Sequence, residues 1–390
     1  MGIFDIIRCG HGIFFVALQT MLMFGFFMEW LRDKKAATAA EKNPHDAKVS
    51  IIIPIHNEKD RMEGLLRTLL VQSCPAQIIF IDDRSTDGSS AMLAHFAANA
   101  GMRGIDCRVI TLKENPGSNR KQFALSRGIS ESSGDYLLFT DGDCEIPPGW
   151  VKSMSNRIQQ KGVGAVIGPV FKKKQGKGFF YLYQCYDHAV RYNYLAGAIG
   201  LGAAGGGFGN NLIISREALD AAGGYDAIPP SPTEDAALIS QIRSMGKYSV
   251  RAAAHPDAAV ETAEEKSWSA FINQTLRWNN GGIYSPETLT RFNYNLLMLV
   301  ISTGILAIPF LPFFPELWPM PAGVLIVMIE NTIAVFALFR KKMPRSVSGA
   351  PGRIRLIFGY FLTLLFMPCY LTLMTLMGYA HIKTKWKGNY

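Results

Sequence analysis

The segment from 135 to 143 reads Asp135-Tyr136-Leu137-Leu138-Phe139-Thr140-Asp141-Gly142-Asp143. Its short apolar run stops at two carboxylates that are separated by one glycine. This layout is typical of a buried strand that delivers oxygen ligands into a crevice, where a divalent cation meets a phosphate-bearing substrate. An ordinary Asp-Gly-Asp turn after a strand would explain the same residues. The choice between the two interpretations depends on the rest of the chain.

Apolar, β-branched runs alternate with helical stretches on either side of this segment. The runs lie at 49–55, 77–83, 107–112 and 164–171, and the helical stretches lie at 58–72, 87–100, 118–130 and 178–195. Strands that alternate with helices predict a parallel sheet with helices on both faces. Burial of both faces explains why the strands are continuous apolar runs. We therefore expect an α/β fold with a Rossmann-like, mostly parallel sheet.

Acidic residues stand at the ends of two of these predicted strands. Asp82 and Asp83 end the second run, as Asp141 ends the run described first. Ligands of such sheets bind in the crevice beyond the carboxyl ends of the strands, so this coincidence predicts a nucleotide site. The sequence has no Gly-x-Gly-x-x-Gly after the first run and no P-loop pattern, which argues against dinucleotide oxidoreductases and P-loop enzymes.

Four apolar segments flank this central region, at 13–30, 296–314, 324–339 and 356–379. Each can span a bilayer as a helix, which takes about 20 residues. The first has no small-residue cleavage site and runs into the basic cluster at 32–35, so we expect an anchor followed by a cytoplasmic domain. The Pro-rich stretch at 309–315 suggests that one later segment is re-entrant or interfacial. The expected domains are an anchor at 1–35, a catalytic domain at 36–293, and a membrane region with a basic tail at 294–390.

The formal net charge of +9 lies largely beside the apolar segments. Basic residues in that position match anionic lipid headgroups. We therefore expect membrane lipids as partners and no nucleic acid, with the protein integral to the cell (inner) membrane. The six cysteines lack the spacing of a zinc site or a disulfide framework.

Three further groups of residues could carry chemistry or serve structure alone. Thr233-Glu234-Asp235 opens a predicted helix and is explained structurally as an N-cap with acidic residues in the first turn. Gln274, Arg277 and Trp278 lie within another helix, where they also fit an amphipathic patch. The Gly-rich stretch at 205–211 is either a loop that lets backbone approach a ligand or a flexible connector.

Taken in chain order, these elements closely resemble the membrane-bound family 2 glycosyltransferases. The matching motifs are Pro54-Ile55-His56-Asn57-Glu58, Asp82-Asp83-Arg84-Ser85-Thr86-Asp87, Asp141-Gly142-Asp143, Thr233-Glu234-Asp235 and Gln274-x-x-Arg277-Trp278. The sequence departs from the family at Arg84, where glycine is more common, and this position lies beside the nucleotide. The resemblance implies a GT-A fold and an inverting transfer from a nucleotide sugar, with a UDP-sugar as the favoured donor.

The resemblance also implies a role for each matching residue. Asp143, with Asp141 near the ribose or the metal, holds Mg²⁺ or Mn²⁺ under the leaving diphosphate. Asp235 is the expected base that deprotonates the acceptor hydroxyl, with Glu234 assisting or orienting it. The other expected donor and acceptor contacts are Pro54, Asn57, Glu58, Asp82, Asp83, Lys121 or Arg120, Gly209, Asn210, Gln274, Arg277 and Trp278.

Two kinds of acceptor fit the motifs, a lipid or lipid-linked glycan and a growing polysaccharide. A processive polysaccharide synthase needs a channel, which usually takes more spanning helices than the apolar segments after the central domain provide. We therefore favour the lipid acceptor. A transporter would use Glu330 and Asn331 within an apolar segment, and a non-catalytic membrane scaffold is the remaining alternative. None of the expected carboxylates is missing, which favours an enzyme.

Overall fold

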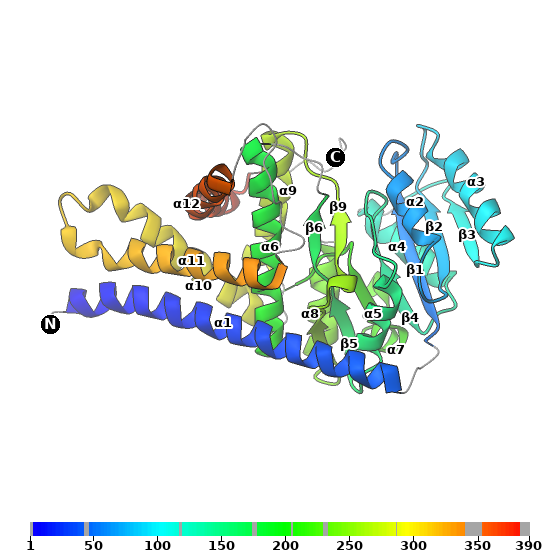
Figure 1. Ribbon diagram of the computed structural model, residues 1–390, viewed down its shortest axis with the longest axis horizontal. Helices are drawn as coiled ribbons and strands as arrows, with labels where there is room; N and C mark the ends of the chain where they lie inside the picture. The colour runs from blue at the N-terminus through cyan, green and yellow to red at the C-terminus, as the bar shows by residue number, and fades with distance from the viewer. Residues whose placement is uncertain are drawn as a thin grey trace. The chain divides into compact units, whose positions relative to one another are not determined.

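The computed structural model describes residues 3–42, 47–116, 119–173, 178–203, 206–228, 233–285, 287–339 and 353–382. It divides into two compact units, which are described separately (Figure 1). The sheet unit comprises Phe27–Phe171 and Ala204–Ala263, and the helical unit comprises Met1–Phe26, Lys172–Ala203 and Glu264–Tyr390. These limits follow internal contacts. The expected domain limits, at 1–35, 36–293 and 294–390, concern the membrane and stay a prediction.

The sheet unit is built on a seven-stranded sheet in the order β3-β2-β1-β4-β7-β5-β8. Its strands are β1 (Val49–Ile55), β2 (Gln77–Asp82), β3 (Cys107–Thr111), β4 (Tyr136–Phe139), β5 (Val163–Ile167), β7 (Leu212–Ser215) and β8 (Ser249–Ala252). Strand β7 is antiparallel to β4 and β5, and the other pairs are parallel. A mostly parallel α/β sheet is therefore confirmed. A two-stranded sheet pairs β6 (Val170–Lys172) with β9 (Val260–Thr262).

The helices of this unit follow the expected alternation, with two differences. They are α2 (Glu63–Leu69), α3 (Ser89–Met102), α4 (Arg120–Ser130), α5 (Trp150–Ile158), α7 (Arg216–Ala221) and α8 (Glu234–Ser244), with 3₁₀ turns η1 (Tyr225–Ala227) and η2 (Pro256–Ala258). Helix α2 begins later than expected, because the residues before it form a turn in which the carbonyl of Glu58 accepts the N–H groups of Arg61 and Met62. The strand expected at 164–171 is split into β5 and β6. The break consists of Gly168 and Pro169. The N–H of Gly168 donates to the carbonyl of Asn211, and Pro169 has no N–H to donate.

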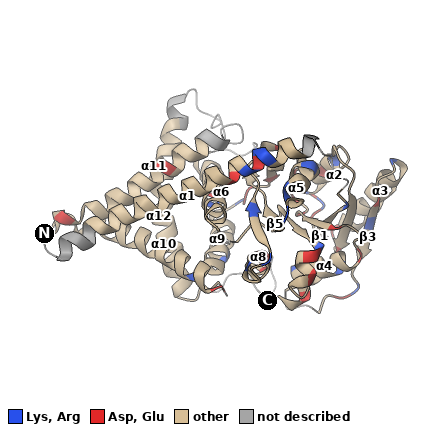
Figure 2. Ribbon diagram, turned by 90° about the horizontal axis from the view of Figure 1, so that it is seen from below, with Lys and Arg blue, Asp and Glu red and all other residues tan. Residues whose placement is uncertain are grey.

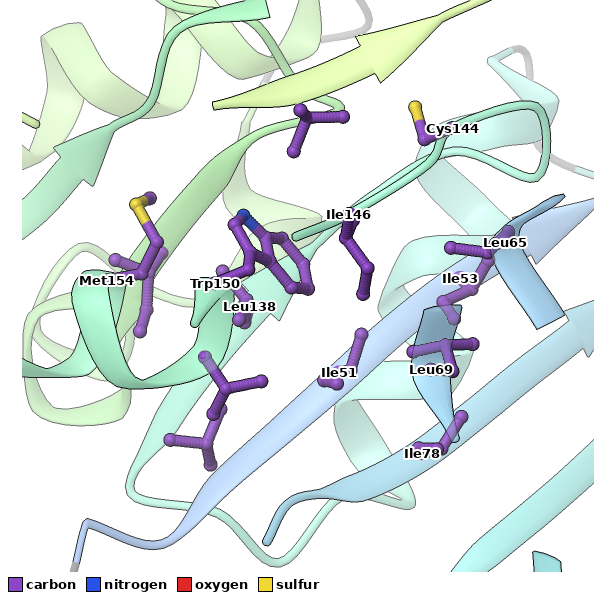
Figure 3. Packing of buried hydrophobic residues seen from close by; sticks show 14 of the residues in the cluster. Ile51, Ile53, Leu65, Leu69, Ile78, Leu138, Cys144, Ile146, Trp150 and Met154 are labelled. Atoms are coloured by element: carbon purple, nitrogen blue, oxygen red, sulfur yellow. The ribbon is translucent and has the colours of Figure 1, made fainter. Parts of the chain in front are cut away.

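Apolar side chains from β1, β2 and β4 pack against α2 and α5 (Figure 3). Trp150 of α5 is fully buried, and its indole Nε1 donates to Oδ1 of Asn211 over 2.9 Å. Burying one such large side chain stabilises the fold by about 1.5–3 kcal/mol. The core residues of Figure 3 include Ile51, Ile53, Leu65, Leu69, Ile78, Leu138, Ile146 and Met154. This core holds the three central parallel strands in register and so fixes the edge where their carboxyl ends meet.

The last part of α1 (Ile3–Lys42) is fixed to the sheet unit by buried charges. Arg157 of α5 donates to Oε2 of Glu29 over 2.9 Å, and neither side chain is exposed to solvent. The same oxygen accepts the N–H of Ala252 in β8 at 2.9 Å. Asp33 accepts the backbone N–H groups of residues 254 and 255 at 2.9 and 2.7 Å. These bonds explain why Phe27 and the residues after it belong to the sheet unit.

The helical unit contains α6 (Gly178–Gly200), α9 (Trp268–Ile283), α10 (Thr288–Leu306), α11 (Pro319–Phe339) and α12 (Arg353–Tyr379), besides the first part of α1. In the described part of the chain, four segments are long and apolar enough to cross a membrane: Cys9–Ala39, Thr288–Phe310, Pro315–Phe336 and Ile357–Tyr379. Figure 2 shows few charged residues along α10, α11 and α12. The expected apolar segments are thus confirmed as helices of spanning length.

The Pro-rich stretch falls between two of these segments. The 3₁₀ turns η3 (Ile308–Phe310) and η4 (Pro315–Leu317) connect α10 with α11. The stretch therefore includes the bend between two candidate spans, and the expectation of a re-entrant segment is not needed to explain it. Most of the basic tail, with Lys383, Lys385 and Lys387, lies outside the described residues.

Polar side chains tie three helices of this unit together. Oδ1 of Asn331 in α11 accepts from Gln19 of α1 at 3.0 Å and from Asn193 of α6 at 2.9 Å. All three side chains are buried. Such bonds fix helices to one another in apolar surroundings. Asn331, which a transporter would use for its cargo, is therefore engaged in packing.

Candidate active site at the carboxyl edge of the sheet

The parallel strands bring the predicted acidic residues to one edge of the sheet. Asp82 is the last residue of β2, and Asp141 and Asp143 follow β4, with β1 paired between the two strands. Because β7 is antiparallel, its first residue, Leu212, lies opposite Phe139 at the end of β4. The loop at 206–211 therefore enters the sheet at the same edge, whereas Gly205 lies outside the described residues.

Helix α4 supplies a lysine that contacts the Asp-Gly-Asp segment. The helix begins at Arg120, with Asn119 as its N-cap accepting the N–H of Gln122. Lys121 Nζ then donates to Oδ1 of Asp141 over 2.7 Å. Burial opposes the charge on this ammonium, but Asp141, Glu234 and Asp235 outweigh burial and raise the pKa of Lys121. Lys121 is thus a fixed cation among three carboxylates.

Helix α8 presents the two acidic residues of the Thr233-Glu234-Asp235 motif. Thr233 precedes the helix, and its side chain makes no capping bond, so the motif is not explained as a side-chain N-cap. Burial raises the pKa of Glu234 to about 7; Lys121 lowers this pKa and Asp235 raises it. A Cβ placed on Gly209 would lie 2.9 Å from Oδ2 of Asp235, closer than a real Cβ approaches. A larger residue at 209 would therefore require the carboxylate of Asp235 to shift.

Asp143 is held more loosely than the carboxylates around it. Its closest contacts in the described residues are Nη1 of Arg61, 3.6 Å from Oδ2, and the thiol of Cys144, 3.8 Å from Oδ1. Arg61 itself is oriented by Glu58, whose Oε2 lies 2.6 Å from Nη2. Glu58 therefore acts on this region through Arg61, and its direct contact with a substrate stays a prediction.

The donor set of this edge fits a magnesium or manganese ion. Hard cations bind carboxylate oxygens, and Mg²⁺ is usually held by one or two carboxylates together with substrate phosphates. Asp141 and Asp143 supply such oxygens, and the loose contacts of Asp143 leave its carboxylate able to serve as a ligand. Among the described residues there is no cluster of three His, Cys, Asp or Glu that would hold a metal alone. The site therefore fits an ion shared with a phosphate-bearing ligand.

The loop after β2 is stabilised by its own acidic residues. Asp82 is buried, and its two carboxylate oxygens accept from the N–H of Ser85 and the hydroxyl of Ser90. Asn57 braces the same loop, since its Oδ1 accepts the N–H of Thr86 at 2.8 Å. Both residues thus shape the loop, and their predicted contacts with base and ribose remain a prediction, as does that of Pro54 within β1.

The loop before β7 contains one predicted and one unexpected amide. Asn210 Nδ2 donates weakly to Sγ of Cys144, 3.7 Å away, directly after the Asp-Gly-Asp segment. The neighbouring Asn211 is fully buried and donates to the carbonyls of Pro169 and Ala258, each at 2.8 Å. Asn211 is a structural residue that fixes the loop, which leaves Asn210 and Gly209 at the site.

Gln274, Arg277 and Trp278 lie on α9, in the helical unit. Gln274 Nε2 donates to Glu265 at 2.8 Å, and the Trp278 ring packs edge-on against His188 with ring centres 5.3 Å apart. The guanidinium of Arg191 lies 5.5 Å from the centre of the Trp278 ring. Their expected closure over the diphosphate and acceptor stays a prediction.

Gln122 was not among the predicted site residues. It lies next to Lys121 and donates through Nε2 to the carbonyls of Ile228 and Tyr225, at 2.8 and 3.3 Å. It thereby ties the first turn of α4 to the segment that leads toward Glu234. No local pattern signals this role, because the bonded residues are 106 and 103 positions apart in the chain.

The fold and the site define an α/β protein with carboxylates at the carboxyl edge of its sheet. Residues 50–223 match the family described as glycosyl transferase family 2. This match covers the segment that carries Asp82, Asp83, Asp141 and Asp143, and it supports a family 2 glycosyltransferase domain. The mannosyltransferase PcManGT from Pyrobaculum calidifontis, solved in complex with GDP-Man and Mn²⁺, has a similar fold, with a TM-score of 0.51 and 18% identity over 96% of this chain and 100% of that chain. The expected GT-A fold is thus confirmed.

Curated relatives extend the comparison along the sequence. The probable glycosyltransferase YdaM of Bacillus subtilis is 24% identical over 70% of this chain and 67% of its own length. An undecaprenyl-phosphate 4-deoxy-4-formamido-L-arabinose transferase of Serratia proteamaculans is 30% identical over 34% of this chain and 39% of its own length. The chain spans only 19% and 43% of two further relatives, the glycosyltransferases GlyA and GlyG of Streptococcus pneumoniae.

Proposed function

We propose that this protein transfers a sugar from a nucleotide sugar, with a UDP-sugar favoured, to a lipid or lipid-linked glycan acceptor at the membrane. The observation that carries the proposal is the position of Lys121. Its ammonium donates to Asp141 over 2.7 Å and interacts electrostatically with Glu234 and Asp235. Lys121 thus lies between Asp141, which we assign to the donor, and Glu234 and Asp235, which we assign to the acceptor. A transfer between two substrates needs both groups of carboxylates at one site.

The donor half of the site suits a diphosphate that gains charge as it leaves. When bound, Mg²⁺ or Mn²⁺ on Asp143 and Asp141 would supply a Lewis acid for this charge. Lys121 and Arg61 supply fixed positive charge at the same edge, and preorganised charge of this kind stabilises a transition state without reorganisation. The mannosyltransferase with a similar fold was solved with GDP-Man and Mn²⁺, which supports a nucleotide sugar as donor.

The acceptor half needs a base on the side of the anomeric carbon opposite the leaving group. Asp235 is our candidate, because it is half-buried in the first turn of α8 and its carboxylate lies against the backbone of Gly209 at the edge of the sheet. It takes the proton of the acceptor hydroxyl as the new bond from oxygen to the anomeric carbon forms. The bond between that carbon and the phosphate oxygen breaks, and the nucleoside diphosphate leaves with the electron pair. This sequence inverts the configuration.

Membrane helices of spanning length support an acceptor that resides in the bilayer. The Serratia proteamaculans relative carries undecaprenyl phosphate in its description, which is an acceptor of this chemical class. We place the sheet unit on the cytoplasmic side of the cell membrane, where nucleotide sugars are made. Protease access in sealed vesicles tests the orientation, and a sheet unit protected in inside-out vesicles would contradict it.

A donor screen tests the proposed function. Purified protein in lipid nanodiscs is given a panel of UDP- and GDP-sugars with Mn²⁺ and a polyprenyl-linked sugar that carries free hydroxyl groups, and release of nucleoside diphosphate is measured together with product length. We expect release that requires both a donor and the lipid, with one sugar added per lipid. Long polymer would favour a polysaccharide synthase, and no release from any donor would contradict transfer.

A further inference from the structure

Arg84 has an unusual backbone for a residue with a long side chain. Its φ of 57° lies in the left-handed region, which glycine adopts freely and which a Cβ disfavours. The other described residue of the sheet unit with this property is Asn57, whose short polar side chain tolerates the region. A strained backbone persists where the surrounding structure enforces it, and such residues cluster at ligand sites. Arg84 therefore calls for an explanation through its side chain.

The side chain of Arg84 is held at one end and open at the other. Its Nε donates to Oδ1 of Asp83 over 2.8 Å, and Asp83 is itself fixed by Nδ2 of Asn115, 2.9 Å from Oδ2. The side chain of Arg84 keeps about a third of its exposure (35%), whereas that of Asp83 is buried (8%). Within the described ranges, the two Nη atoms have no hydrogen-bond partner. Their donors are therefore free for a ligand, in a fixed direction.

The position of Arg84 along the sheet edge indicates which part of a nucleotide it meets. It follows β2, whereas Asp141 and Asp143 follow β4, and β1 lies between these strands. Two strand spacings separate the two loops by about 10 Å. If the diphosphate lies at the β4 end, an extended nucleotide puts its base toward β2 and β3. Arg84 then faces the base and not the diphosphate.

We propose that Arg84 selects the base of the donor nucleotide by donating from its free Nη atoms to a carbonyl oxygen of that base. This inference rests on the proposed function and deepens it. A guanidinium donates hydrogen bonds and accepts none. Uracil and guanine place a carbonyl oxygen where cytosine and adenine place an amino group. Arg84 thus favours UDP- and GDP-linked donors over CDP- and ADP-linked ones.

Direct binding of four nucleotides tests this proposal without transfer. UDP, GDP, CDP and ADP are titrated with Mn²⁺ into the full-length protein in nanodiscs by calorimetry. The variants are Arg84→Gly and Arg84→Asn, since both residues tolerate the left-handed backbone. We expect each variant to lose about tenfold in affinity for the preferred keto nucleotide and little for CDP and ADP, because one charge-assisted hydrogen bond is removed. The melting temperature of each variant is measured beside the affinities, because glycine relieves the backbone strain whereas Asp83 loses its ion pair with Nε.

Arg103→Gly is the matched control. Arg103 is exposed at the end of α3, and α3 leads from the carboxyl end of β2 toward the start of β3, so Arg103 lies toward the opposite edge. The nucleotide affinities of the Arg103→Gly variant should equal those of the wild type. Equal affinities in the Arg84 variants, or an equal loss for all four nucleotides, would overturn base selection. If the wild type binds none of the four, the proposed nucleotide-sugar function fails as well.

Discussion

Lys121 Nζ lies 2.7 Å from Oδ1 of Asp141 and interacts electrostatically with Glu234 and Asp235 across the same edge of the sheet. The lysine and these carboxylates come from α4, the segment after β4 and the start of α8, which are far apart in the sequence. The ammonium of Lys121 thus interacts favourably with all three carboxylates.

Replacing Lys121 tests this arrangement directly. Lys121→Met removes the ammonium, so Asp141 loses a charge-assisted hydrogen bond and the repulsion among the three carboxylates is no longer offset. We expect kcat/KM for sugar transfer to fall roughly ten- to a hundredfold. The measurement is release of nucleoside diphosphate at saturating lipid acceptor. Lys152→Met, at an exposed position of α5, is the control, and an equal loss in both variants would assign no special role to Lys121.

The raised pKa of Glu234 predicts a pH dependence of stability. Burial lifts this pKa from an ordinary 4.5 to about 7, so the folded protein binds the proton more tightly than the unfolded chain. The stability that this proton provides is present below 4.5 and is lost as pH rises through 7. Glu234→Gln stays neutral at every pH. Its melting temperature minus that of the wild type should therefore increase from about pH 5 to about pH 8.

The metal-free protein is used for this comparison, with Glu217→Gln as control. Glu217 is exposed on α7, and its hydrogen bonds to Tyr248 and Lys247 lower its pKa, so its contribution has the opposite sign. A difference for Glu234→Gln that stays constant with pH would show that Glu234 is not protonated in the folded protein near neutrality.

Much of the fold was predictable from the sequence because alternating strands and helices are local patterns. The carboxylates at 82–83 and 141–143 were predictable for the same reason, since parallel strands share their carboxyl edge. The antiparallel β7 was not, because strand order depends on pairing between distant segments. Arg61 and Gln122 were missed because each acts through residues that only the folded chain brings near, such as Asp143 and Ile228.

The resemblance to a family identified Arg84 as a departure but gave no reason for glycine at that position. The backbone supplies the reason, since its φ of 57° suits glycine. The Thr233-Glu234-Asp235 motif has a local explanation as an N-cap with acidic residues in the first turn. Thr233 does hold the N-cap position, and Glu234 and Asp235 lie in the first turn of α8, but the Thr233 side chain makes no capping hydrogen bond.

The buried ion pair of Glu29 and Arg157 predicts a large loss of stability on breaking it. Arg157→Met removes the cation at Oε2 of the buried Glu29 and leaves this carboxylate with the N–H of Ala252 and with Arg32, whose Nη1 lies 2.6 Å from Oε1. Breaking one side of a buried pair costs about 3–5 kcal/mol, and because Arg32 remains we expect a loss at the lower end of this range. Thermal unfolding in nanodiscs measures the change. Because most of the cost is the remaining charge, Glu29→Gln combined with Arg157→Met should recover part of the lost stability.

The exposed pair of Lys247 and Glu217 is the matched control for that experiment. Its atoms are 3.0 Å apart, close to the 2.9 Å of the buried pair, but both side chains are mostly in solvent. Lys247→Met should leave the melting temperature almost unchanged, because solvent screens such pairs. If Lys247→Met and Arg157→Met lowered the melting temperature equally, burial would not explain the stability that the Glu29 pair provides.

Asp143 should matter for metal binding and little for folding. Its contacts with Arg61 and Cys144 are long, so Asp143→Asn removes little from the fold. We expect an unchanged melting temperature and a loss of the Mn²⁺ dependence of UDP binding, measured by calorimetry with and without EDTA. Asp220→Asn, at an exposed position of α7, should retain that dependence. UDP affinity that EDTA leaves unaltered in the wild type would exclude a metal role for Asp143.

Asp235→Asn separates chemistry from binding. The amide keeps the shape beside Gly209, whose backbone lies too close to Oδ2 of Asp235 for a larger residue, but it cannot take a proton. A positioned base contributes about 10²- to 10⁴-fold, so transfer should fall by that factor while the affinity for UDP stays within about twofold of the wild type. Single-turnover transfer and calorimetry give the two numbers. Should turnover persist with a lower affinity for the donor, Asp235 would belong to donor binding, and Glu234 would be the remaining acidic candidate for the base on α8.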